Sequence, residues 1–456
     1  MYRKALFILV VLMFSVGTVW AADPVELKIV VWAKAAGVER WRSDIVPEAA
    51  AALNEELKAE GSNVTVVTED VNEEADWADY KKKFAMAAED GSAPDIVCSG
   101  HEDIATWSQA GYIIPLADSI EQIKGMAPEF DDVIESLWNS ASWHGKVWAV
   151  PQDTEARPMF YSKTKLKALG WSDADIEALP DKIAKGEFTL EDMIATAKEA
   201  MDKGIVEPGF GYWHRPVKGG DYLQYYMSHG GEIYDPAEDK LVIVKDALER
   251  WYAFQRECVT SGITPDKYIG TEWKIWHDTV ANDKAMFWNG GIWQWADWAL
   301  NYAEGGEPAL FERVGYALQP ASRDGGIPGT LSHPLVYMIT TEKASSNTHR
   351  DIVLRLLAKM TTPELNTRHA VESTHLGILK SQMEYEPYKS SRFLADVTYM
   401  LDHNYYQPNH AMYGVWFDTV WGGMLAAEQG EKSPADAAKD AVGLLELELE
   451  DYLIIK

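Results

Sequence analysis

The chain of 456 residues contains only two cysteines, Cys98 and Cys258, which excludes a fold held together by several disulfide bonds. An oxidising compartment would allow one bridge, but free cysteine is a strongly buried residue type, so two buried free thiols are expected. Common enzyme signatures are also missing, since the sequence has no GxxxxGK[ST], GxGxxG, GxSxG, HExxH or CxxC motif. These absences argue against the common nucleotide-, cofactor- and metal-dependent enzymes, and we expect neither a cofactor nor a metal.

Basic residues are also few compared with acidic residues. Lys and Arg number 42 against 71 Asp and Glu, which gives a formal net charge of −29. A field of that sign repels phosphate backbones and anionic lipid surfaces. We therefore expect no nucleic-acid partner and no attachment to acidic membranes.

The N-terminus carries a short apolar run rather than a membrane span. Arg3 and Lys4 precede the apolar residues 5–14, and Ala21 ends a plausible small-residue cleavage site. The run is shorter than the roughly 20 residues of a spanning helix, although a short membrane anchor is the alternative. The sequence thus predicts a signal peptide at 1–21, cleaved near Ala21. The mature protein would be periplasmic with a charge of −31, because cleavage removes Arg3 and Lys4.

Aromatic residues are abundant, with 19 Trp and 21 Tyr. Indole faces stack on the C–H faces of sugar rings, while Asp, Glu, Asn, Arg and His bind the hydroxyl groups. This composition suits a neutral polyhydroxylated ligand. Trp213 and Trp288 stand beside glycines at loop-like positions and are candidate contacts, whereas tryptophans in helical patterns, such as Trp251, are expected to fill the core.

Strand and helix patterns alternate along the first hundred mature residues. Strands are expected at 27–32, 63–68 and 94–98, and helices at 45–60 and 77–89. Such alternation indicates a parallel α/β sheet, whose ligands bind beyond the carboxyl ends of the strands. A second α/β region follows, with crossings between domains expected at 147–161 and 314–320.

Seven segments together resemble one known family, although none is specific alone. They are GSAPD (91–95), AGYIIPL (110–116), WHGKVWAVP (143–151), FYSK (160–163), HGGE (229–232), DKAMFWNGGIW (283–293) and GYALQP (315–320). In this order they resemble the extracellular solute-binding proteins of ABC importers, the group that includes maltose-binding protein. The resemblance spans nearly the whole mature chain.

The resemblance implies an α/β, two-lobed periplasmic-binding-protein fold of type II with three hinge crossings. The implied N-terminal lobe comprises 22–152 plus 319–361, and the C-terminal lobe 153–318 plus 362–456. Such a protein would be a non-enzymatic monomer that captures a neutral carbohydrate or polyol between its lobes. Its second partner would be an ABC importer permease, to which it delivers the ligand.

The family's ligand contacts map onto nine positions of this sequence. They are Trp32, Asp70, His101, Glu155, Trp213, Trp288, Trp293, His333 and His375. Arg157 is expected to pair with Asp153 or Glu155 in a structural role. The family often has a bulky side chain where Cys98-Ser-Gly100 stands, which leaves the sugar, its anomer and its length open.

The alternative is a secreted glycan-degrading enzyme that uses two carboxylates, Glu155 and Glu372, around a bound sugar. The length of the resemblance argues against this alternative.

Overall fold

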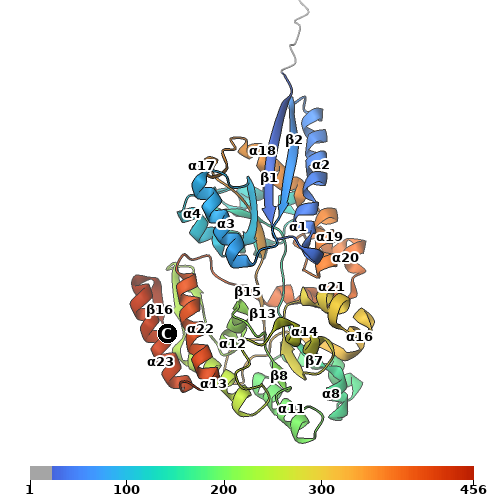
Figure 1. The fold of residues 1–456 in the computed structure, drawn as a ribbon, viewed down its shortest axis with the longest axis vertical. Coiled ribbons are helices and arrows are strands. Elements are labelled where there is room, and N and C mark those ends of the chain that lie inside the picture. Colours follow the sequence, from blue (N-terminus) through green and yellow to red (C-terminus); the bar gives the residue numbers. More distant parts are fainter. Residues whose placement is uncertain (1–22) are drawn as a thin grey trace, which may run out of the picture.

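The computed structural model describes residues 23–456, so the predicted signal peptide lies outside the described residues. Two separate hydrophobic cores divide this part of the chain into an N-terminal and a C-terminal lobe, which follow one another along the long axis of the molecule (Figure 1). Among the described residues, no helix is long and apolar enough to cross a membrane.

The N-terminal lobe is built on a five-stranded sheet in the order β2-β1-β3-β14-β6. Its strands are β1 (Val25–Ala33), β2 (Val64–Asn72), β3 (Ile96–Gly100), β6 (Ala149–Pro151) and β14 (Leu335–Ile339). β1 runs parallel to β2 and β3, whereas β14 runs antiparallel to β3 and β6. A strand from late in the chain therefore lies between two early ones.

Helices connect the first strands as the sequence pattern predicts. α2 (Val46–Ala59) joins β1 to β2, and α3 (Trp77–Asp90) joins β2 to β3. The Asp76 side chain accepts a hydrogen bond from the Asp79 amide and caps α3, while Gly91 ends it at a φ of 76°. The other helices assigned to this lobe are α1 (Trp41–Asp44), α4 (Asp103–Gln109), α5 (Ile120–Lys124), α6 (Pro128–Asp131), α7 (Glu135–Ser140), α17 (Glu342–Ser345) and α18 (Arg350–Met360).

The C-terminal lobe has a four-stranded sheet in the order β12-β7-β11-β8. The strands are β7 (Met159–Ser162), β8 (Tyr212–Trp213), β11 (Phe287–Asn289) and β12 (Val314–Ala317). Its principal helices are α11 (Leu190–Asp202), α12 (Leu223–Ser228), α13 (Lys245–Thr260), α14 (Trp273–Ala281), α16 (Gly306–Arg313), α22 (Tyr413–Glu428) and α23 (Pro434–Leu449). After β11 the chain forms the short helix α15 (Gln294–Asp297), followed directly by a π turn at Trp298–Tyr302.

Much of the tryptophan lies in the core of this lobe. The fully buried indoles here are those of Trp251, Trp276, Trp288, Trp295, Trp298 and Trp416. The expectation that tryptophans in helical patterns are core residues is confirmed for Trp251, Trp276, Trp295 and Trp298. Trp273, which shares the pattern, is only partly buried against this core. Part of the aromatic excess therefore lies in the interior of this lobe.

The chain passes from one core to the other at several points, and three of these passages border the site described below. The first passage joins β6 to β7, and the second joins β12 to β14. The third runs through α19 (Pro363–Ser373), where Leu365 packs in the N-terminal core and Ala370 in the C-terminal core. The second passage is longer than a crossing near 319 suggests, because β13 (Thr330–Ser332) pairs with β15 (Asn404–Tyr406) before the N-terminal core resumes at Leu335.

Both cysteines are free and buried, one in each lobe, as the sequence led us to expect. Cys98 lies in β3 and Cys258 in α13. Burial raises the pKa of both thiols, which keeps them protonated and unreactive.

Candidate functional site

A cavity of about 630 Å³ lies between the two lobes. This volume falls within the range of small-molecule binding sites. The N-terminal lobe contributes Glu39, Arg42 and residues from α3 and from the end of β3 onward, while the three passages and the C-terminal lobe contribute the rest. The residues that carry the argument below are Glu39, Arg42, Lys81, Glu102, Asp153, Glu155, Arg157, Arg215, Asp221, Trp293, His333, His375 and Tyr413.

Trp293 is a half-buried aromatic side chain on the cavity wall. The guanidinium groups of Arg157 and Arg215 lie 5.0 and 5.5 Å from its ring centroid, and the His375 ring stacks at 5.9 Å. The indole folds back over Gly291, where a Cβ atom would overlap the Trp293 ring. Glycine is therefore required at position 291 on steric grounds. Polar groups surround the indole.

Two arginines on this wall are held by carboxylates. Arg157 pairs with Glu155 and with Asp221, each at 2.5 Å, and Arg215 pairs with Asp221 at 2.5 Å. The pair of Arg157 with Glu155 is one of the two that the sequence led us to expect. Burial raises the pKa of Glu155 to about 7, although Arg157 favours its charged form.

A second ion pair joins the end of β3 to the second passage. His333 Nε2 lies 2.6 Å from Glu102 Oε2, and Lys81 Nζ lies 2.7 Å from Glu102 Oε1. Burial disfavours the charged form of Glu102, but His333 and Lys81 outweigh it and hold the pKa of this carboxyl well below its usual range. Burial likewise opposes the charge on His333, yet Glu102 raises its pKa.

The carboxylate of Asp153 connects the three passages. Its Oδ1 accepts from the backbone N–H of Leu335 at 2.9 Å, and its Oδ2 accepts from Arg42 at 2.9 Å and from His369 at 3.2 Å. These partners come from the second passage, the N-terminal lobe and α19. Burial opposes the charge, but His375 and Arg42 lower the pKa of Asp153 far below its usual range. We call Glu39, Arg42, Asp153, His369 and His375 the hinge cluster.

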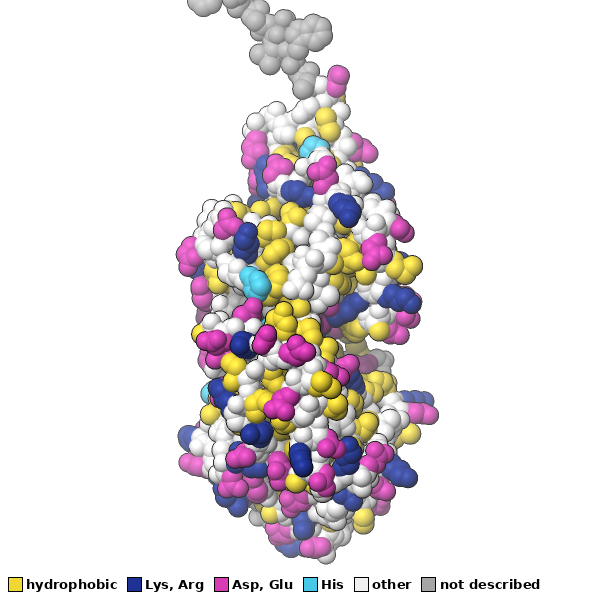
Figure 2. Space-filling view, turned by 90° about the vertical axis from the view of Figure 1, so that its left-hand side faces the viewer, with side chains coloured by type: hydrophobic (Ala, Val, Ile, Leu, Met, Phe, Trp, Pro, Cys, Tyr) yellow, Lys and Arg dark blue, Asp and Glu magenta, His cyan; other side chains and the backbone are white. Residues whose placement is uncertain are grey.

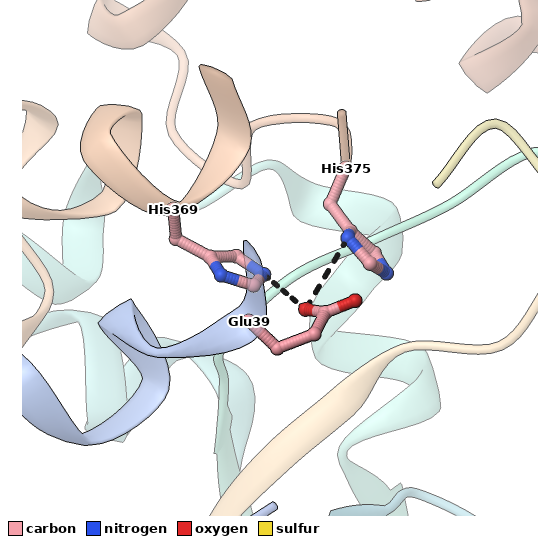
Figure 3. A group of neighbouring side chains, drawn as sticks. All are labelled: Glu39, His369 and His375. Atoms are coloured by element: carbon pink, nitrogen blue, oxygen red, sulfur yellow. Dashed lines mark ion pairs between the residues drawn. The ribbon is translucent and has the colours of Figure 1, made fainter. Parts of the chain in front are cut away.

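Two groups of described residues have ligand atoms close enough for a metal ion, and both are already occupied by protein cations. Glu39 Oε2 lies 3.8 Å from His369 Nε2 and 3.7 Å from His375 Nδ1 (Figure 3), but Arg42 also pairs with this oxygen at 2.8 Å. The second group is His101, Glu102 and His333, in which Lys81 pairs with the carboxylate. In each group, an arginine or a lysine already pairs with the carboxylate that a metal ion would need as a ligand.

Four of the nine predicted contact residues line the cavity: Glu155, Trp293, His333 and His375. His101 is fully buried beside it, with Nε2 3.0 Å from the carbonyl oxygen of Gln407. Trp32 and Asp70 lie outside the cavity lining, near the ends of β1 and β2. Lys83 covers the Trp32 ring at 4.8 Å, and Asp70 is exposed.

Trp213 and Trp288 lie in the C-terminal core and do not line the cavity. Trp288 is fully buried and its ring lies parallel to Phe160 at 5.9 Å. Trp213 donates its indole N–H to the carbonyl of Gly209 at 2.6 Å and stacks on Phe210. The glycines beside them accompany tight packing of the sheet, so the loop-like sequence pattern does not place these rings on the cavity wall.

Sequence reasoning missed several residues that line the cavity. Arg42, Lys81 and Asp221 lie in segments that read as ordinary helix or loop. Each has at least one ion-pair partner that is 21 or more residues away, namely Asp153, Glu102 and Arg157. Tyr413 begins α22, and its buried hydroxyl has no hydrogen-bond partner among the described residues. Only the position of Asp153 in a predicted crossing could have pointed to its role.

Residues 43–367, well over half of the chain, match the sequence model of the bacterial extracellular solute-binding proteins. The chain belongs to this family. No curated protein matches it significantly. The two-lobed α/β fold predicted from the sequence is confirmed by solved structures.

Three solved structures illustrate the likeness, and at their low sequence identities they show a shared fold. The GacH receptor of Streptomyces glaucescens has a TM-score of 0.69 at 20% identity, over 93% of this chain and 99% of that chain. MalE of Xanthomonas citri has a TM-score of 0.70 at 14% identity, over 91% and 95%. Maltose-bound T. maritima MalE3 has a TM-score of 0.67 at 18% identity, over 92% and 99%.

Proposed function

We propose that the protein is an exported, monomeric solute-binding protein that holds a neutral carbohydrate or polyol in the interlobe cavity. It then delivers this ligand from the periplasm to the permease of an ABC importer. The observation that supports this proposal best is the cavity itself. It lies between two lobes of a solute-binding-protein fold, and its wall presents the Trp293 indole among hydrogen-bonding groups.

A neutral ligand is favoured because the cations of the cavity already have carboxylate partners. The pairs are Arg42 with Asp153, Lys81 with Glu102, Arg157 with Glu155, Arg215 with Asp221, and Lys218 with Asp418. Because each cation is neutralised by a carboxylate of the protein, the site does not require a charged ligand. The lone pairs of these carboxylates and the N–H groups of the cations that are not used in the pairs can bind hydroxyl groups. On the outer face shown in Figure 2, acidic and basic side chains lie interspersed over both lobes.

The glycan-degrading alternative finds no support in the placement of its two carboxylates. Glu155 lines the cavity, whereas Glu372 lines a separate groove beside Trp41. There Glu372 accepts hydrogen bonds from Arg40 at 2.8 Å and from the Trp41 indole at 2.5 Å. Glycosidase carboxylates must flank one bond, within about 10 Å of each other. The family match is likewise to binding proteins.

Thermal unfolding in a library of monosaccharides, polyols and disaccharides tests the proposal. A ligand that binds only the folded state raises the melting temperature by mass action. We expect at least one neutral sugar or polyol to raise it in a concentration-dependent manner and to be recovered intact. Turnover of the sugar, or no shift with any neutral compound, would contradict the proposal.

A further inference from the structure

A second cavity, of about 770 Å³, also lies between the lobes. The N-terminal lobe lines it with residues 139–145, and the C-terminal lobe with residues from 227–239. The third wall is the segment 405–409, which begins within β15 and precedes α22. Gln407 lines both cavities, so this segment separates the second cavity from the first.

The separating segment is attached to the N-terminal lobe at two points. His101 Nε2 lies 3.0 Å from the Gln407 carbonyl oxygen. Asn409 Nδ2 donates to the carbonyls of Ser140 and Ser142 at 2.7 and 2.9 Å. These contacts hold the wall in place, so the second cavity is a built feature and not a gap beneath a loose loop.

Aromatic rings line much of this cavity. The half-buried Trp143 indole stacks with the His144 ring at 3.9 Å and an interplanar angle of 19°. Tyr234, Tyr405 and Tyr406 add three more rings. Flat apolar faces of this kind suit the C–H faces of a sugar ring.

The polar groups of the lining are suited to a neutral molecule with hydroxyl groups. Among residues 23–456, neither lysine nor arginine lines the second cavity, which disfavours an anion. Its two carboxylates already have cationic or donor partners, which disfavours a cation: Asp239 binds His144 at 2.8 Å and Tyr234 at 2.7 Å, and Glu232 pairs with Lys456. The buried Oδ1 of Asn409 has no hydrogen-bond partner among the described residues and can accept from a hydroxyl.

We propose that the second cavity is a further carbohydrate-binding site, separate from the first and suited to a mono- or disaccharide that stacks on Trp143. The inference takes its ligand class from the proposed function, but it depends on different residues. The two sites can therefore be tested apart.

The test counts bound sugar molecules by native mass spectrometry and measures each affinity by calorimetry. The probes are glucose, sorbitol, maltose and maltotriose, each titrated into the intact mature protein. We expect two bound molecules with at least one probe. Trp143→Ala should weaken one binding event more than tenfold and leave the other unchanged, while Trp143→Phe should retain both because it keeps a flat ring.

Trp293→Ala serves as the reciprocal variant and Trp171→Ala as the matched control. Trp171 is a half-buried indole that lines neither cavity, so its loss should change neither event. A single event that is lost in Trp293→Ala and unchanged in Trp143→Ala would overturn the second site and leave the proposed function standing. A single event lost only in Trp143→Ala would support the second site against the first. No binding of any probe would overturn the second site.

Discussion

Trp288 and Trp293 lie on one short segment but in different surroundings. Trp288 lies in β11, where it is fully buried and packs against Phe160 and Trp298. Trp293 precedes α15, where Arg157, Arg215 and His375 lie against its ring at the cavity. Residue type and adjacent glycines do not distinguish the two indoles. The groups packed on their faces do, since apolar rings lie against Trp288 and planar polar groups lie against Trp293.

The largest expected effect is on stability, for the Trp288→Ala variant. Deleting a fully buried indole leaves a cavity and typically costs about 3–5 kcal/mol of folding free energy. Urea unfolding should show this loss, while the fraction that remains folded should bind sugar with nearly unchanged affinity. Trp213→Ala should behave in the same way, because Trp213 also packs in the core. A variant of normal stability that no longer binds sugar would contradict the assignment of its tryptophan to the core.

The hinge cluster should make stability depend on pH. Burial lowers the pKa of His375 to about 4, from an ordinary value of 6.5. The unfolded chain therefore binds more protons between pH 4 and 6.5, and the free energy of unfolding falls as pH decreases through this range, by at most about 3 kcal/mol. His375→Gln should flatten the pH profile measured by urea unfolding. An unchanged slope would mean that His375 is not the titrating group.

Trp293→Ala should give the opposite pattern to Trp288→Ala. Its half-buried indole contributes little to the core but presents a face to the ligand. We expect the affinity for sugar to fall more than tenfold, or at least about 1.4 kcal/mol, with a near-native melting temperature of the free protein. Calorimetric titration and thermal unfolding of the same variant provide both numbers. Loss of stability without loss of affinity would assign Trp293 to the core.

Salt should have the smallest effect. Because the charges of the cavity are paired within the protein, affinity for a neutral sugar should change little between low and high ionic strength. Titrations at both salt concentrations measure this directly. A steep loss of affinity at high salt would indicate a charged ligand.

Local patterns in the sequence predicted the first half of the N-terminal lobe well. The alternation of β1, α2, β2, α3 and β3 depends on periodicity and capping within single segments, so it is readable without long-range information. The position of β14 between β3 and β6 is different, because it depends on pairing over more than two hundred residues. No local signal contains that pairing.

The site was harder to predict than the fold for the same reason. Asp153 receives its partners from Arg42, Leu335 and His369, which only the folded chain brings together. Of the ligand contacts that the resemblance implied, Trp293, Glu155, His333 and His375 lie on the cavity wall. It could not tell which tryptophans face the cavity and which face the core, since that depends on the packing of β11 and α15.

A crystal structure of the complex with the sugar selected by thermal unfolding tests the central claim most directly. The account predicts an intact sugar between the lobes, in contact with Trp293 and hydrogen-bonded to the ion-paired groups around Arg157. A sugar bound on the outer surface of one lobe, or cleaved in the cavity, would contradict it.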